Sequence, residues 1–200
     1  MSEPTRPRRP AFTDPARIET LGTGTDPIAR IDAAHETAAV LLGTGRAAAD
    51  PMVTARLVAI VDEVGITTLA DLWADRPAQS LPGALWRLYA LRQWIRENTP
   101  DLAREYAYGV GFADVDHVVA GVDPPGLEEV REVADQILRG AFEGDFAVAL
   151  ERAAAFCRVV VAGRAYATEG LRAAIGAARI RDTATELTEC ARLWRTGDLA

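Results

Sequence analysis

The residues best suited to chemistry lie in the segment Asp114–His117, where two carboxylates, Asp114 and Asp116, and an imidazole fall within four positions. Carboxylate oxygens and imidazole nitrogens are ligands that divalent cations accept. His35 and Glu36, far upstream, could complete a site of the kind that helical bundles build between two helices. One hypothesis is therefore a divalent-metal-dependent enzyme, or a helical protein that binds a small ligand, with these five residues at its site.

Helical spacing argues against a convergent site. Asp114 and His117 are three residues apart and would share one helix face, whereas Asp116 would point elsewhere. His35 and Glu36 are adjacent and would diverge by about 100° around a helix. The alternative is structural: Asp114 caps a short helix, and His117 is a partly buried histidine bonded by a neighbouring group.

Nucleophilic catalysis has little support in the sequence. Cys157 and Cys190 are the only cysteines, without a Cys-x-x-Cys spacing and without a histidine near either of them. No Gly-x-Ser-x-Gly motif occurs. The wide spacing of the two cysteines argues against a zinc site and against a secreted disulfide scaffold. We therefore expect two buried free thiols in a reducing cytoplasm. A non-catalytic protein without a cofactor is favoured over an enzyme.

The strongest binding signal is an aromatic–arginine stretch that contains Trp86, Arg87, Tyr89 and Trp94. Tryptophan, tyrosine and arginine are enriched where proteins bind one another. The competing interpretation is that the aromatic residues belong to the core and that the arginines, Arg92 among them, face water. If some of this aromatic surface stays uncovered, its partner is another protein or a second copy of this chain, in a homodimer.

Composition argues against two other classes of partner. The 200 residues carry a formal net charge of −7, and all 22 basic residues are arginines. An acidic chain without a concentrated basic face repels phosphate backbones, so we expect the folded domain to bind no nucleic acid. The longest apolar run, residues 153–163, contains an arginine and is too short to span a bilayer. Residues 1–10 do not resemble a secretory signal, and we expect a cytoplasmic protein outside the membrane.

Helical periodicity runs through most of the chain, and no stretch alternates at period two for more than a few residues. Asp26 and Asp50 each precede a proline, which is the pattern of a helix N-cap followed by proline in the first turn. Gly43 and Gly45 are expected to end the first of these helices.

Residues 127–163 are predicted to form two antiparallel helices, with the reversal at Gly140 and Gly144 and an N-cap at Asp145. The second of these helices is apolar around most of its circumference, which is typical of a helix inside a bundle. A long helix over residues 168–195 follows, in which charged residues near position 180 could mark a kink.

These patterns together predict an all-α fold, a compact and irregular bundle of seven to nine helices. Residues 25–200 are expected to form this single domain. Residues 1–24 are rich in proline and arginine and are expected to form a flexible arm in front of it.

Parts of the sequence resemble two known kinds of helical protein. Residues 143–150 resemble the turn and second-helix start of a tetratricopeptide repeat, with Gly144, Phe146 and Ala149 in its small–aromatic–small pattern. That family forms peptide-binding solenoids. The match covers about a quarter of a repeat of ~34 residues and has no second copy, so we interpret it as the common sequence pattern of a helical hairpin.

The second resemblance is wider. Residues 81–89, 112–121 and 153–158 resemble a family of actinobacterial all-helical proteins of unsettled function, and the resemblance runs over most of residues 15–165. One family of this kind, ParJ, binds the chromosome-segregation ATPase ParA. The resemblance implies a role in protein binding, and it carries no site motif. The resulting hypothesis is a non-catalytic cytoplasmic regulatory or adaptor protein, with an ATPase of the ParA type as one implied partner.

Overall fold

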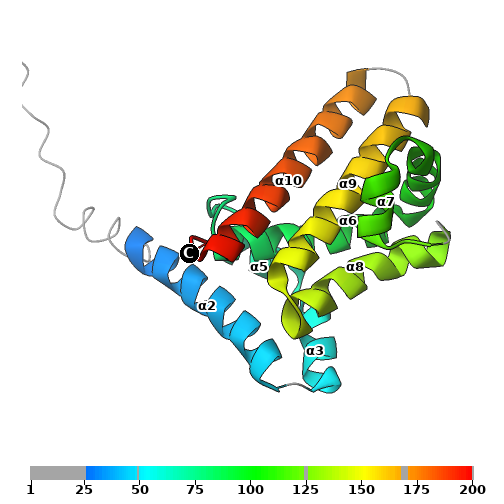
Figure 1. Cartoon of the computed structure of the whole chain (residues 1–200). Helices are drawn as coiled ribbons and strands as arrows, with labels where there is room; N and C mark the ends of the chain where they lie inside the picture. The colour runs from blue at the N-terminus through cyan, green and yellow to red at the C-terminus, as the bar shows by residue number, and fades with distance from the viewer. Residues whose placement is uncertain (1–25, 49, 124–125, 168–170, 200) are drawn as a thin grey trace, which may run out of the picture.

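The computed structural model of the chain describes residues 26–48, 50–123, 126–167 and 171–199. Within these ranges the chain forms nine α-helices, one 3₁₀ helix and no strand (Figure 1). The predicted all-α bundle and the predicted number of helices are thereby confirmed. The predicted arm over residues 1–24 lies outside the described residues. Across the described ranges, no helix combines the length and the apolar character needed to cross a bilayer.

The helices follow one another with short connections. In chain order they are α2 (Pro27–Ala48), α3 (Pro51–Val58), α4 (Ile60–Val64), α5 (Ile66–Trp73), α6 (Leu81–Gly109), the 3₁₀ helix η1 (Val110–Phe112), α7 (Asp114–Ala120), α8 (Leu127–Glu143), α9 (Phe146–Ala167) and α10 (Leu171–Thr196).

Local capping fixes where several of these helices begin. The side chains of Asp26, Asp50 and Asp145 each accept a hydrogen bond from the backbone N–H two residues further on, at 3.0, 2.8 and 2.8 Å respectively. Each bond satisfies a donor that the first turn of a helix leaves without an intrahelical partner. These three predicted starts are confirmed.

Two glycines in α2 do not do what their sequence pattern predicts. The helix continues past Gly43 and Gly45 to Ala48. Gly45 instead lies against α8, where a Cβ atom would be 2.8 Å from Cβ of Phe142. The glycine therefore permits a close contact between two helices and does not end one. In α10, by contrast, the charged residues near position 180 cause no break, and the helix is continuous.

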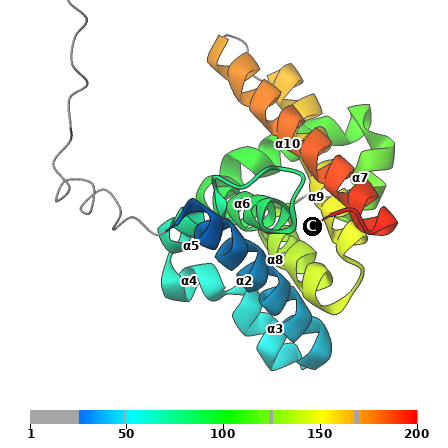
Figure 2. The same cartoon turned by 90° about the vertical axis from the view of Figure 1, so that its left-hand side faces the viewer.

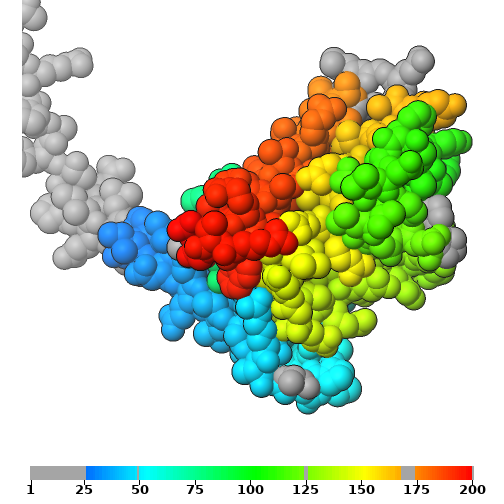
Figure 3. Space-filling view, in the orientation of Figure 1, coloured from blue at the N-terminus to red at the C-terminus, as the bar shows by residue number. Residues whose placement is uncertain are grey.

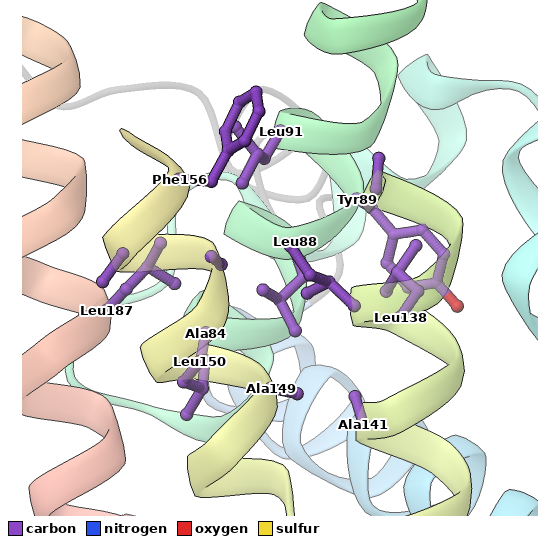
Figure 4. Close-up of a cluster of buried hydrophobic side chains, with 14 of the residues drawn as sticks. Ala84, Leu88, Tyr89, Leu91, Leu138, Ala141, Ala149, Leu150, Phe156 and Leu187 are labelled. Atoms are coloured by element: carbon purple, nitrogen blue, oxygen red, sulfur yellow. The ribbon is translucent and has the colours of Figure 1, made fainter. Parts of the chain in front are cut away.

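Two central helices organise the bundle. The α9 helix packs against α10, α6, α7 and α8, and α6 packs against α9, α8, α2 and α5 (Figure 2). The predicted α8–α9 hairpin forms, but α8 continues through Gly140, and the reversal lies at Gly144 and Asp145. The α9 helix is buried around most of its circumference. In Figure 4, Leu88 of α6 points between α8 and α9, toward Leu138 and Ala149. The hydrophobic core therefore lies among these helices.

The crossing of α6 and α9 depends on a pair of glycines. A Cβ atom on Gly163 would lie 1.6 Å from the backbone oxygen of Glu105, and one on Gly109 would lie 1.9 Å from the backbone oxygen of Val159. Neither position has room for a side chain, because the obstructing atoms belong to the opposite backbone. The two helices can approach this closely only with glycine at both positions.

One arginine lies inside the bundle, contrary to the sequence interpretation that placed it in water. Arg92 of α6 is 2% exposed. Its Nη1 and Nη2 atoms donate to both carboxylate oxygens of Asp62, at 3.3 and 2.9 Å, and its Nε donates to Asp135 at 2.5 Å. The guanidinium thereby joins the α4–α5 region, α6 and α8, with its carboxylate partners at the rim of the bundle.

Candidate functional site

The candidate site is a groove between α6 and α10, with α9 as its floor. The α10 helix packs along α9 and meets α6 only over a short stretch, which leaves a cavity of about 440 Å³ between the two walls. The lining comes from three helices: Trp86, Arg87, Ala90, Leu91 and Trp94 of α6, Cys157 and Arg164 of α9, and Gly176, Arg179, Ile180, Thr183 and Glu186 of α10. Volumes of this size occur at the lower end of known ligand pockets.

Both tryptophans of the predicted binding stretch face this groove. Trp86 and Trp94 are half-buried, eight residues apart on α6, and pack with one side of their rings against the core. The remaining ring surface lines the cavity. The partly uncovered aromatic surface that the sequence suggests therefore lies in the groove, between α6 and α10.

The predicted binding residue Arg87 spans the groove. Its Nε donates to Glu186 of α10 at 2.6 Å, and its Nη1 donates to the backbone oxygen of Gly83 at 3.0 Å. Both members of the ion pair are partly screened from water, with Arg87 20% and Glu186 33% exposed. This bridge ties α6 to α10 and closes one end of the cavity.

Tyr89, which the sequence also assigned to partner binding, is not part of the surface. Its side chain is fully buried, and its hydroxyl donates to the backbone oxygen of Leu57 at 2.6 Å. Burial raises the pKa of its phenol well above the ordinary value. The assignment was wrong because Tyr89 lies on the face of α6 that α3 and α8 cover, between the rings of Trp73 and Phe142.

At the other end of the groove, Arg164 is held in place by two neighbours. Its Nε and Nη2 donate to the two carboxylate oxygens of Glu105, at 2.8 and 2.7 Å. Its guanidinium also lies over the ring of Trp94, 5.8 Å from the ring centre. A bidentate pair combined with a cation–π contact fixes the orientation of the group.

Cys157 forms part of the groove floor but is not equipped for chemistry. The thiol is fully buried, and this burial raises its pKa to about 12. Cys190 is buried as well, and desolvation raises its pKa to about 11. The thiolate is the reactive form of cysteine, so both thiols stay protonated and unreactive at neutral pH.

Thiol labelling tests this assignment. We expect no reaction of folded protein with Ellman's reagent at about pH 8, and two thiols per chain to react once the protein is unfolded in guanidinium. Rapid labelling of Cys157 in the folded protein would show that the groove floor is open to solvent.

The structure does not bring the five candidate metal ligands together. His35 and Glu36 lie on α2, on the opposite side of the molecule from α7, which carries Asp114, Asp116 and His117 (Figures 1 and 2). Among the residues that the structure describes, no three His, Cys, Asp or Glu side chains are grouped as a metal site requires. The combined site was wrong because nothing in the local spacing placed the two segments on the same side.

Two of the three candidate residues on α7, Asp116 and His117, contact side chains of neighbouring helices. Asp116 accepts a hydrogen bond from Arg158 of α9 at 2.9 Å, and α7 and α9 lie side by side on the face shown in Figure 3. Nδ1 of His117 lies 3.1 Å from the hydroxyl of Tyr106. Asp114 is exposed at the first position of α7, whose N-cap is Ala113, so its predicted capping role was wrong. The predicted partly buried histidine with a neighbouring partner is confirmed.

Sequence reasoning found the α6 wall of the groove and missed the residues that α9 and α10 contribute. Trp86, Arg87 and Trp94 are close together in the sequence, whereas Arg164 and Arg179 are far from them and from each other. The available signal is the group of charged residues near position 180 in an otherwise apolar pattern, which by itself is also compatible with a kink. Those residues include a groove-facing arginine in a continuous helix.

Comparison with known proteins adds no identification: no protein-family model, no curated protein and no solved structure matches the chain. The resemblances to tetratricopeptide repeats and to actinobacterial helical proteins therefore stay expectations from the sequence.

Proposed function

We propose that this chain is a non-catalytic cytoplasmic regulatory or adaptor protein that binds a protein partner in the groove between α6 and α10. The observation that carries the proposal is the placement of Trp86 and Trp94. Their uncovered ring surfaces face a cavity that also contains arginines. Tryptophan and arginine in a concave and partly desolvated setting are typical of the residues that dominate binding energy at protein interfaces.

The reactive side chains support the non-catalytic part of this proposal. Within the described residues, His117 is adjacent to the Tyr106 hydroxyl, Asp116 is paired with Arg158, and both thiols are buried. A general acid or base must reach the reacting atom, with its partners arranged around a shared position. The groove itself contains arginines, one glutamate bonded to an arginine, and a buried cysteine.

A pull-down with matched variants tests the proposal. We expect Trp86→Ala and Trp94→Ala to reduce retention of the partner from a cytoplasmic lysate at least about tenfold, because truncating a central tryptophan costs roughly 2 kcal/mol or more of binding free energy. Purified ParA-type ATPase, the partner that the sequence resemblance implies, serves as a defined second bait. The control is Tyr166→Ala, an exposed aromatic residue 67% accessible at the end of α9 and outside the groove.

Retention should be unchanged in the Tyr166 control, and all three variants should keep the far-ultraviolet spectrum of the wild type. If the two tryptophan variants retain the same proteins as the wild type, the groove is not the binding surface.

A further inference from the structure

The groove has two different ends. At one end, the Arg87–Glu186 pair bridges α6 and α10. At the other end, Trp94 of α6 lies beneath Arg164, which in turn reaches toward Gly176 of α10. The two walls therefore run antiparallel, and a bound segment would meet different chemistry at its two ends.

The charge of the lining is opposite to that of the whole protein. Three arginines and one glutamate line the groove, whereas the chain has a formal net charge of −7. Glu186 neutralises the charge of Arg87. Glu105, which does not line the groove, neutralises the charge of Arg164. Arg179 is exposed on the α10 wall and forms no salt bridge with any residue that the structure describes. The groove thus offers a local positive charge.

Arg164 retains one donor group for a ligand. Its Nε and Nη2 atoms donate to Glu105. Its Nη1 atom points to the α10 wall and lies 3.1 Å from the position that a Cβ atom on Gly176 would take. Glycine within a helix costs roughly 0.5–1 kcal/mol relative to alanine. At this position it leaves room for Nη1 of Arg164 to approach the α10 backbone, one helical turn from Arg179.

The middle of the groove is apolar. Trp86 and Leu91 of α6 face Ile180 of α10 across it, above the buried Cys157. A cavity of about 440 Å³ accepts a few side chains and is too small for a whole amphipathic helix. A protein partner would therefore enter the groove with a short segment that carries at least one apolar side chain.

We propose that the groove binds a short linear segment of the partner that carries an apolar side chain and a nearby carboxylate. The apolar side chain lies between Trp86, Leu91 and Ile180, and the carboxylate lies at the end opposite the Arg87–Glu186 pair, between Arg164 and Arg179. This inference rests on the proposed function, because it specifies what the partner presents to the groove. Arginine is the cation best suited to a carboxylate, since its planar donors match the two oxygens.

Selection from a displayed library of short random peptides on the immobilised full chain tests this inference. We expect enriched peptides to combine apolar residues with Asp or Glu. The strongest binder and its twin with Asn or Gln in place of the acid are then labelled and titrated by fluorescence anisotropy. Arg179→Ala should weaken binding of the acidic peptide about tenfold and leave binding of its neutral twin unchanged.

Arg181→Ala is the matched control, because Arg181 is a second exposed arginine on the same helix and lines a different cavity together with Arg158. It should leave both titrations unchanged. An equal loss in the two arginine variants, or enrichment of peptides without acidic residues, would overturn the carboxylate assignment.

The outcomes also separate this inference from the proposed function. If Trp94→Ala abolishes binding of the peptides but Arg179→Ala has no effect, the groove is the docking site and its charge does not select the ligand. If neither tryptophan variant changes binding, the groove is not the docking site at all. If sedimentation shows a dimer that Trp94→Ala dissociates, the occupant is a second copy of the chain and the inference is overturned.

Discussion

Replacing Gly163 by alanine will destabilise this protein by about 3 kcal/mol or more, although alanine is the better helix former. The added methyl group would be centred 1.6 Å from the backbone oxygen of Glu105. That oxygen belongs to the backbone of α6, so no side-chain rotation can relieve the clash, and α6 and α9 must move apart. The core between these two central helices would lose contacts along its length, which chemical denaturation of the variant measures.

Gly43→Ala is the control for the same substitution. Gly43 is a helical residue of α2 with no atom within 4 Å of the position that its Cβ would take. Alanine there should stabilise the protein by roughly 0.5–1 kcal/mol, since it only reduces the entropy of the unfolded chain. A tolerated Gly163→Ala would show that α6 and α9 are not packed as closely as the structure places them.

Removing both carboxylates around Arg92 will have the second large effect. The guanidinium is 2% exposed, and Asp62 and Asp135 provide its only salt bridges among the described residues. Asp62→Asn or Asp135→Asn alone leaves one ion pair and should cost about 1 kcal/mol. The double variant leaves a buried charge without a counter-ion and should cost about 3–5 kcal/mol, more than the two single effects combined.

Arg92→Met tests the same cluster by removing the arginine and keeping both carboxylates. The carboxylates of Asp62 and Asp135 are 45% and 39% exposed, so water can solvate them once the arginine is removed. The Met variant should therefore be more stable than the double Asn variant in denaturant titration. The surface pair of Asp101 and Arg104 is the control, and Arg104→Ala should leave stability unchanged. Additive effects of the two Asn substitutions would contradict a shared buried partner.

The same cluster predicts how the stability of the protein changes at acid pH. The hydrogen bond and the charge of Arg92 hold the pKa of Asp62 below its ordinary value of 3.8. The Asp62 carboxylate binds fewer protons in the folded than in the unfolded state. Its contribution to the stability of the fold is therefore present above pH 3.8 and is lost as the pH falls through the pKa of the folded state. We expect Asp62→Asn to flatten this part of the stability–pH curve, and an unchanged slope would show that the ion pair contributes nothing.

The amino-acid sequence by itself determined the helices and many of their ends. The caps at Asp26, Asp50 and Asp145 depend on hydrogen bonds that reach only two residues along the chain, and such bonds can be predicted from local sequence. The α8–α9 hairpin follows from apolar spacing and a short turn, which are local as well. The all-α class followed from the same periodicity, because each helix must bury its apolar face against another.

The tertiary structure alone decided which faces of those helices are covered. The periodicity of α6 does not distinguish Tyr89, buried against α3 and α8, from Trp86 and Trp94, which reach the groove. It likewise could not show that Arg92 lies between two carboxylates distant in sequence. The groove exists because α10 packs on α9 and leaves the side of α6 open, and the relative placement of three helices is a property that no local pattern contains.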